Sequence, residues 1–159
     1  MGHEYRATVL WTRGDAAFAD GQYSRGHAWR FDDGFTVPAS ASPLHVPVGS
    51  VAAAVDPEEA FIASLSSCHM LFFLHFAARR KLVVERYEDA AVGEMAKNAT
   101  GKDFIAKVTL NPHVTFQGET RPNEEDVVAL HHRAHEECFI ANSVKREVIV
   151  GTSTVAFTE

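Results

Sequence analysis

Two cysteines are the residues of this chain best suited to redox or nucleophilic chemistry. Cys68 lies within an apolar stretch that runs from Asp56 to Met70, and Cys138 ends a polar stretch that begins at His131. A thiolate is a nucleophile and a metal ligand, whereas a buried neutral thiol packs as a small hydrophobic side chain. The two thiols could therefore form a redox pair, share a metal ion, or belong to separate parts of a core.

A reactive role for Cys68 requires a positive charge nearby, because such a charge favours the thiolate form. Cys68 lies about three turns into its predicted helix, so the helix dipole contributes little there. The cation must come from elsewhere in the fold, and the candidates are arginines of the N-terminal strands and loops: Arg13, Arg25 and Arg30. Without such a partner, Cys68 is an ordinary core residue.

Glu58 adds a geometric condition. With a rise of 1.5 Å per residue, Glu58 and Cys68 lie about 15 Å apart along one straight helix. Glu58 can serve the thiol only if the same helix of a second subunit, running antiparallel, delivers it. The alternative is that Glu58 only complements the positive end of its own helix dipole.

Histidines near the second cysteine offer a metal site as a rival to the redox pair. His131, His135 and Cys138 are spaced i, i+4, i+7, which places them on one helical face. Two imidazoles and a thiolate are zinc ligands, and Cys68 or His69 would supply the fourth. The pattern has neither a paired Cys-x-x-Cys nor a His-Glu-x-x-His motif, so we expect packed or solvated histidines and no metal or other cofactor.

Length and charge narrow the class of protein. The 159 residues fit a single domain, which we expect to span residues 1–159. The net charge of −6 argues against nucleic acid or an anionic membrane surface as the main partner. The longest apolar run, residues 70–78, is too short to span a bilayer and contains His75. The N-terminus lacks a signal peptide's apolar core, so we expect a cytoplasmic protein whose thiols stay reduced unless their oxidation has a purpose.

The elements that must position these residues begin with three strands. Alternating side chains predict a strand over residues 5–12, and a second strand is expected near 22–31. An Asp-Asp-Gly turn at 32–34 predicts a hairpin into a third strand at 35–37. Residues 38–56 hold three prolines and no Lys or Arg, which is typical of an ordered loop.

The first cysteine lies in a helix with a clear start. Pro57 occupies the first helical position, Asp56 is the expected N-cap, and Glu59 completes a capping box. The helix ends on cations at 79–81, which suit the negative end of its dipole. Because its apolar residues fall on nearly every face, we expect a central, buried helix.

The second cysteine lies beyond two further strands. We expect strands over residues 83–95 and 104–116 with a turn at 98–102, then a helix from Asn123, and a last strand over 146–157. The order βββ-α-ββ-α-β predicts an α+β fold with antiparallel sheets.

The motifs around the cysteines resemble those of the OsmC/Ohr family, the osmotically inducible and organic hydroperoxide resistance proteins. The run Asp-Pro-Glu-Glu at 56–59, followed by Ser-Cys-His at 67–69, is similar to the family's Pro-Glu helix start and helical cysteine at the same interval. The run Ala-His-Glu-Glu-Cys at 134–138 resembles the Ala-His-x-x-Cys motif of the hydroperoxide branch. The order of segments agrees over essentially the whole chain.

The resemblance implies an OsmC-like fold: an intertwined homodimer whose antiparallel sheets wrap around the central helices, with active sites at the subunit interface. It also implies a cysteine-based, peroxiredoxin-like peroxidase for organic hydroperoxides that acts in defence against oxidative stress. Cys68 would attack the peroxide and become a sulfenic acid, and Cys138 would condense with it to a disulfide. An external dithiol of the lipoyl type would reduce that disulfide. Neighbouring aromatic residues would favour a peroxide with an apolar tail: Phe61, Phe72, Phe73 and Trp29.

The resemblance also assigns the residues that would activate the thiol. Glu58 matches the family glutamate that holds the activating arginine. That arginine is Arg25 by a narrow choice, with Arg13 alongside it because Arg13 lies in the loop after the first strand. Two departures from the family pattern are His69 after the first cysteine, in place of Phe, and Phe139 after the second, in place of Pro. They leave open a non-catalytic or redox-sensing ligand-binding protein on the same fold.

Overall fold

The computed structural model describes residues 2–145 and 147–158 of the chain. Two compact units form, unit 1 (Met1–Ala60) and unit 2 (Phe61–Glu159). The single domain expected from the sequence stays a prediction. The elements in chain order are β1 (Thr8–Leu10), β2 (His27–Arg30), the 3-10 helix η1 (Asp32–Gly34), β3 (Thr36–Ala39), α1 (Pro57–Arg79), β4 (Val83–Asp89), β5 (Val92–Lys97), β6 (Asp103–Leu110), β7 (Pro112–Gln117), α2 (Glu124–Glu137), α3 (Phe139–Ser143), β8 (Glu147–Val150) and β9 (Thr154–Thr158).

Unit 1 is built around a small antiparallel sheet of order β1-β2-β3. The strands expected over 5–12 and 22–31 are present but shorter. The predicted turn is confirmed: η1 contains Asp33 and Gly34 with φ of 56° and 80°, a left-handed conformation that Asp tolerates and Gly adopts freely.

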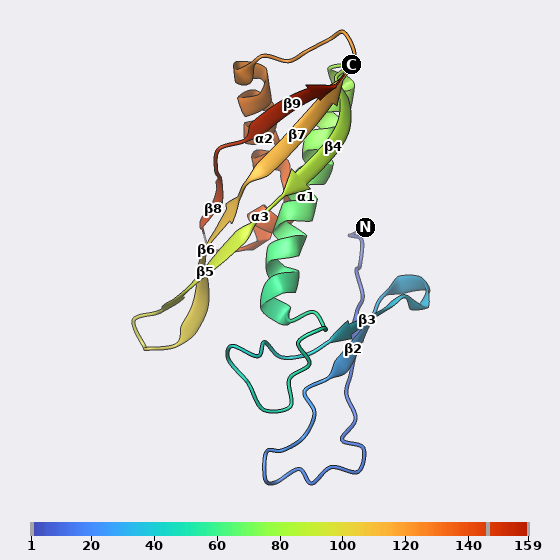
Figure 1. The fold of residues 1–159 in the computed structure, drawn as a ribbon, viewed down its shortest axis with the longest axis vertical. Coiled ribbons are helices and arrows are strands. Elements are labelled where there is room, and N and C mark those ends of the chain that lie inside the picture. The colour runs from blue at the N-terminus through green and yellow to red at the C-terminus, as the bar shows by residue number, and fades with distance from the viewer. Residues whose placement is uncertain (1, 146, 159) are drawn as a thin grey trace. The chain divides into compact units, whose positions relative to one another are not determined.

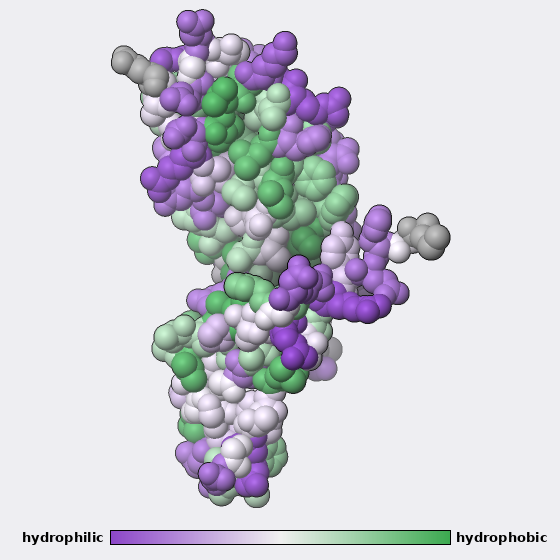
Figure 2. Space-filling view, turned by 90° about the vertical axis from the view of Figure 1, so that its right-hand side faces the viewer, coloured by the Kyte–Doolittle hydropathy of each residue, from purple (hydrophilic) through white to green (hydrophobic). Residues whose placement is uncertain are grey.

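Much of the apolar surface of unit 1 is not covered by the chain itself. Buried residues are few: Ala39, Ser40, Ser42 and Asp56. Large apolar side chains are exposed instead: Tyr5, Val9, Leu10, Trp11, Phe18, Phe31, Phe35, Leu44, Val48 and Val51. Figure 2 shows such apolar residues in green at the molecular surface. Large exposed apolar patches typically mark interaction sites, so these side chains are candidates for an interface.

The predicted capping box fixes the start of α1. The Oδ1 atom of Asp56 accepts a hydrogen bond from the Glu59 backbone N–H at 2.8 Å, and Glu59 Oε2 accepts one from the Asp56 N–H at 3.3 Å. Pro57 needs no N–H partner at the first helical position. Two otherwise unpaired donors of the helix end are thereby satisfied.

Within unit 2, α1 buries one face rather than all of them. Leu65, His69, Phe73 and Phe76 are buried at helical spacings of three and four. Leu71, on the opposite face, is 60% exposed. The expectation of a helix buried on nearly every face is therefore wrong for the single chain, because the sheets and α2 cover only one side.

By length and composition α1 is also apolar enough to cross a membrane. Its buried face instead contributes to the core of unit 2. That core consists of two clusters: Phe73, Phe76 and Ala77 with Leu82, Val114, Phe116, Val127, Leu130 and Ala134, and Leu65 with Val108 and Leu110. The first cluster packs α1 and α2 against the sheet that contains β7 (Figure 1). A core helix of a globular protein passes the same composition test.

Unit 2 contains two three-stranded sheets, of order β4-β7-β9 and β5-β6-β8. The pairs β4–β7 and β5–β6 are antiparallel, whereas β7–β9 and β6–β8 are parallel. The parallel pairs arise because the chain returns through α2 and α3 before β8 and β9. The α+β class is confirmed, but these two sheets are mixed and not purely antiparallel as expected.

Three strands expected to be continuous are each divided in two. The segments 83–95, 104–116 and 146–157 form the pairs β4 and β5, β6 and β7, and β8 and β9. The expected first residue of the last strand, Arg146, lies outside the described residues. Each long strand thus contributes one half to each sheet of unit 2.

Hydrogen bonds connect the three break points to one another and to α1. Asp89 Oδ1 accepts a hydrogen bond from the Asn111 backbone N–H at 2.6 Å, and the Gly151 N–H donates to the Leu110 carbonyl at 2.8 Å. The other carboxylate oxygen of Asp89 accepts from Ser66 Oγ on α1 at 2.5 Å. Asp89, where the chain passes from one sheet to the other, is therefore bonded to α1 at Ser66, two residues before Cys68.

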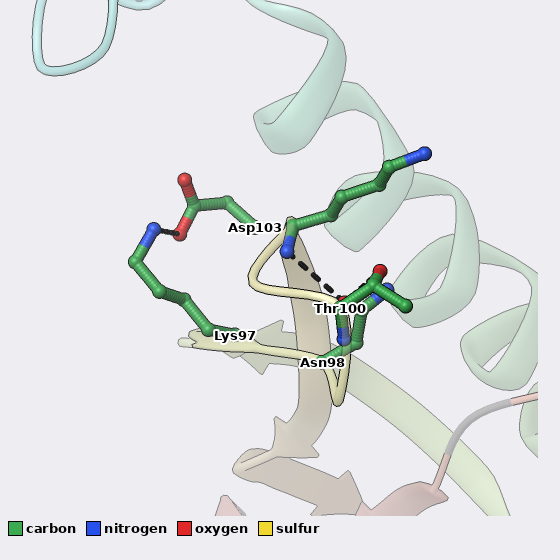
Figure 3. A network of polar contacts seen from close by, with 5 residues as sticks. Lys97, Asn98, Thr100 and Asp103 are labelled. Atoms are coloured by element: carbon green, nitrogen blue, oxygen red, sulfur yellow. Dashed lines mark hydrogen bonds and ion pairs between the residues drawn. The ribbon is translucent and has the colours of Figure 1, made fainter.

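The predicted turn between β5 and β6 is confirmed (Figure 3). Asn98 Oδ1 accepts hydrogen bonds from the backbone N–H and the hydroxyl of Thr100, at 2.9 and 2.8 Å, and from the Lys102 N–H at 3.0 Å. Lys97 and Asp103 form an ion pair of 2.7 Å across the hairpin, and Gly101 has φ of 80°. An Asn side chain that mimics a backbone turn is a usual hairpin device.

Candidate active site

Cys138 occupies the junction of two helices. Helix α2 starts at Asn123 as predicted, through a capping box between Asn123 and Asp126. Cys138 is both the C-cap of α2 and the N-cap of α3, a short helix not expected from the sequence. Its Sγ accepts a hydrogen bond from the Ala141 N–H at 3.4 Å, and its carbonyl accepts one from Asn142 Nδ2 at 3.0 Å. With the residue 1% exposed, the sulfur is held firmly inside unit 2.

The side chains of Cys68 and Cys138 lie within hydrogen-bonding reach of each other, and their role as a redox pair stays a prediction. Both are free thiols, and Cys68 is half-buried on α1. Burial first, and then hydrogen bonding and charge from Cys68, raise the pKa of Cys138 to about 11, although the Ala141 amide acts in the opposite direction. Cys138 is consequently protonated at neutral pH and is a poor nucleophile in that form.

The aromatic residues expected near the thiols have different roles. Phe72 on α1 packs edge-on against Phe139, with ring centroids 5.1 Å apart, so the residue that replaces the family proline holds α3 against α1. Phe73 lies in the core. Phe61 packs beside the second core cluster, and Trp29 lies in unit 1, where its Nε1 donates to His27.

His69 points into a buried chain of hydrogen bonds. Its Nε2 lies 3.0 Å from His131 Nδ1, and His131 Nε2 lies 3.0 Å from Ser153 Oγ. The Phe73 ring stacks on His131 with centroids 4.3 Å apart. Burial, followed by the charges of His131 and His135, lowers the pKa of His69 to about 3, and burial lowers that of His131 to about 4. Both imidazoles are therefore neutral at neutral pH.

These hydrogen bonds engage His131, which the predicted metal site would need as a ligand. Both ring nitrogens of His131 are engaged, one by His69 and one by Ser153. Within the part of the chain that the structure describes, no group of three or more His, Cys, Asp or Glu side chains is arranged to hold a metal ion. The rival metal-site hypothesis for His131, His135 and Cys138 gains no support from the geometry.

Arg25 is firmly placed within unit 1. Its backbone N–H donates to the Gly49 carbonyl at 2.7 Å, and its guanidinium carbon lies 3.8 Å from the centre of the Tyr23 ring. A Cβ at residue 49 would lie 2.1 Å from the Tyr23 carbonyl oxygen, and φ there is +76°, so only Gly fits. Arg25 Nε is buried with no hydrogen-bond partner among the described residues, which leaves a donor for another group.

The other predicted residues of unit 1 are less constrained. Arg13 is exposed, and its Nη1 donates to the Ala16 carbonyl of its own loop at 2.6 Å. Glu58 is half-buried in the first turn of α1 and has no ion pair with any described residue. Arg30 is exposed at the end of β2. The action of any of these arginines on Cys68 stays a prediction.

Comparison with protein-family models shows which family this chain belongs to. The family described as OsmC-like protein matches residues 49–153. The chain belongs to the OsmC-like family. The matched residues of this OsmC-like protein include Glu58 and both cysteines, whereas Arg13 and Arg25 lie before them.

Solved structures share the fold over nearly the whole chain. An OsmC-like protein of unknown function from Vibrio cholerae is 52% identical, with 97% of this chain and 99% of that chain covered and a TM-score of 0.91. An OsmC-like protein from Mycoplasma pneumoniae is 16% identical, with 98% and 99% covered and a TM-score of 0.73. An organic hydroperoxide resistance protein from Bacillus subtilis is 18% identical, with 98% of each chain covered and a TM-score of 0.62. No curated protein matches this sequence.

Two parts of this OsmC-like protein's site were not predicted. Ser153 joins the histidine chain from the segment between β8 and β9, and no motif marks it. The pairing of His69 with His131 joins residues far apart in sequence. A signal was present in His69 itself, since a polar residue on the buried face of an apolar helix requires a hydrogen-bond partner.

Proposed function

We propose that this OsmC-like protein is a thiol peroxidase that reduces organic hydroperoxides. The observation that carries the proposal is the pairing of half-buried Cys68 with buried Cys138, whose thiol stays protonated at neutral pH. Two neighbouring thiols of different burial allow different roles in one catalytic cycle. The fold shared with organic hydroperoxide resistance proteins is consistent with this activity.

The proposed cycle starts at Cys68. Its thiolate attacks the terminal oxygen of the hydroperoxide, the O–O bond breaks, and the sulfur becomes a sulfenic acid while the alkoxide takes up a proton and leaves as an alcohol. Cys138 then attacks the Cys68 sulfur, and its proton leaves with the hydroxyl group as water. An external dithiol of the lipoyl type reduces the resulting disulfide and is itself oxidised to a disulfide.

The activating charge is assigned to Arg25 with Glu58 as its carboxylate partner. Arg25 has an unsatisfied Nε and a fixed backbone, and Glu58 has no ion pair within the described residues. A guanidinium held by a carboxylate is a common way to position a permanent positive charge. Arg13 is the second choice, because its guanidinium is exposed and engaged with its own loop.

The active form in this proposal is a homodimer in the cytoplasm. Glu58 and Cys68 are ten residues apart on one helix, so the glutamate acts on the thiol of the other subunit. The exposed apolar side chains of unit 1, and Leu71 on the uncovered face of α1, supply surface for such an interface.

The test is stopped-flow oxidation by tert-butyl hydroperoxide, followed by turnover with dihydrolipoamide. Wild-type protein should lose thiol rapidly, and Cys68→Ser should abolish that loss. Cys138→Ser should keep the first oxidation and accumulate a sulfenic acid that dimedone traps. Ser67→Ala, at an exposed neighbour, is the matched control and should behave as wild type.

Normal turnover in Cys68→Ser would overturn the proposal. A wild-type protein that consumes no hydroperoxide with any dithiol would instead favour the second candidate, a redox-sensing or ligand-binding protein on the same fold. The departures at His69 and Phe139 favour that candidate, because His69 is engaged in a buried chain and Phe139 in packing against Phe72.

A further inference from the structure

Unit 2 contains a cavity of about 650 Å³ between α2 and the segment from β8 to β9. Its walls are mainly apolar and include Val127, Val128, Val155 and Phe157. Neither cysteine lines it. A cavity of this size is within the usual range for small-molecule sites, which combine apolar walls with a few polar groups.

The polar groups of the cavity belong to the buried histidine chain. His131 and Ser153 both line the cavity, and His69 lies behind them as the third member of the chain. His69 and His131 are 1% and 4% exposed, so water does not satisfy their ring nitrogens. The direction of the two hydrogen bonds therefore decides what Ser153 presents to the cavity.

Two directions are available for neutral imidazoles. If His131 Nδ1 donates to His69, the Nδ1–H of His69 remains as a buried donor, and Nδ1 of His69 has no partner among the described residues. If His69 Nε2 donates to His131, the orphan at His69 Nδ1 is only a lone pair, which costs less than an unpaired N–H. The second direction is thus favoured, and His131 Nε2–H then donates to Ser153 Oγ.

This direction leaves the hydroxyl proton of Ser153 free to point into the cavity. His135 also lines the cavity, and its Nδ1 is buried without a hydrogen-bond partner within the described part of the chain. A ligand with an acceptor atom would satisfy the Ser153 hydroxyl. The wall thus offers a hydroxyl donor at a fixed place among apolar side chains.

The charges around the cavity disfavour an ionised ligand. Among the described residues that line the cavity, none is Lys or Arg, and the one carboxylate is that of Glu124. His132 also lines it but is paired with Glu136 at 3.6 Å. Burying a carboxylate without a cation is costly, whereas a carbonyl oxygen needs only a donor.

We propose that this cavity binds an uncharged, mainly apolar molecule through a carbonyl oxygen that accepts a hydrogen bond from the Ser153 hydroxyl. The site is separate from the thiol pair and does not depend on its chemistry. Octan-2-one is a suitable probe, because it combines a carbonyl group with an apolar chain.

Titration calorimetry with octan-2-one tests the site. Wild-type protein should show saturable binding, and Ser153→Ala should weaken it about fivefold, the usual effect of one lost hydrogen bond. Val128→Trp should block the cavity, since Val128 lines it and is 60% exposed. Val83→Trp is the matched control: Val83 is 53% exposed on β4, outside the lining, and its variant should bind as wild type. Cys68→Ser should also bind normally, which separates this test from that of the peroxidase.

Three results would overturn the site: no saturable binding to wild-type protein, equal loss in Val128→Trp and Val83→Trp, or tighter binding of octanoate than of octan-2-one. Nitrogen-15 spectra of the histidine rings provide a test that needs no variant. They should show His69 and His131 each protonated at Nε2, and protonation of either at Nδ1 would refute the proposed direction of the hydrogen bonds.

Discussion

Burial controls the ionisation of three side chains in unit 2. Cys138, His69 and His131 are all held in their uncharged forms at neutral pH, because burial removes the water that would stabilise the charge. For Cys138 this preserves a thiol proton for the second step of the proposed cycle. For the two histidines it makes the folded state sensitive to acid.

The histidines predict a loss of stability between pH 6.5 and about 4. Their pKa values are about 3 and 4 when folded and 6.5 when unfolded, so below pH 6.5 the unfolded chain binds more protons than the folded one. The stabilisation is complete above pH 6.5 and is lost as pH falls, by about 2 kcal/mol for each histidine at pH 5. Urea unfolding at pH 7 and pH 5 measures this difference.

His69→Gln is the variant that isolates this effect, since Gln keeps a hydrogen-bonding group and does not titrate. The free energy of unfolding of the variant should fall less between pH 7 and pH 5 than that of wild type. His75→Gln, at an exposed position of the same helix, is the control and should fall as wild type does. An equal fall in wild type and both variants would show that His69 does not carry the acid sensitivity.

At the scale of elements, the bend between the two sheets depends on Asp89. Its carboxylate accepts hydrogen bonds from α1, through Ser66, and from the neighbouring break point, through Asn111. Asp89→Asn removes the negative charge and replaces one acceptor oxygen by an N–H donor, so both charge-assisted hydrogen bonds cannot be kept as they are. We expect a loss of about 1–3 kcal/mol in the free energy of unfolding.

Glu88→Gln is the matched control for this bend. Glu88 is exposed and bonded to Arg86 on the same strand, so its replacement should change stability by less than about 0.5 kcal/mol. Chemical denaturation of both variants gives the comparison. Similar stabilities for Asp89→Asn and Glu88→Gln would mean that the Asp89 hydrogen bonds do not stabilise the bend.

The same elements show which parts of the fold were predictable from sequence. Both helix starts were predictable, because Asp56 and Asn123 cap their helices through contacts within three residues. The division of the long strands was not, because apolar residues continue on both sides of Asp89 and Asn111. The parallel pairing of β8 with β6 and of β9 with β7 depends on contacts across a helical crossover, which no local pattern encodes.

At the scale of the whole molecule, the proposed homodimer requires Glu58 of one subunit to act on Cys68 of the other. Co-expression of Glu58→Gln and Cys68→Ser chains tests this requirement. A mixed dimer then contains one site with both wild-type groups, although each variant alone is inactive. With random mixing, about a quarter of wild-type peroxidase activity should return.

The contrasting outcome is equally clear. Mixtures that stay as inactive as the separate variants, although tandem purification of differently tagged chains yields mixed dimers, would contradict a glutamate supplied by the partner. Cys138→Ser with Cys68→Ser is the control, because both cysteines lie in unit 2 and their pairing within one chain predicts no recovery. The resemblance of their motifs to a known family predicts the cysteine pair. The histidine chain that ends at Ser153 could not be predicted, because it depends on the crossover of the chain.

The sulfur cap of α3 gives this protein a built-in reporter. Helix α3 starts with a hydrogen bond from the Ala141 amide to Cys138 Sγ. A disulfide to Cys68 would reorient that sulfur, so the first turn of α3 would loosen and its amide protons would exchange faster with deuterated solvent. Deuterium uptake by residues 139–143 would then record the oxidation state of the thiols without any added dye or label.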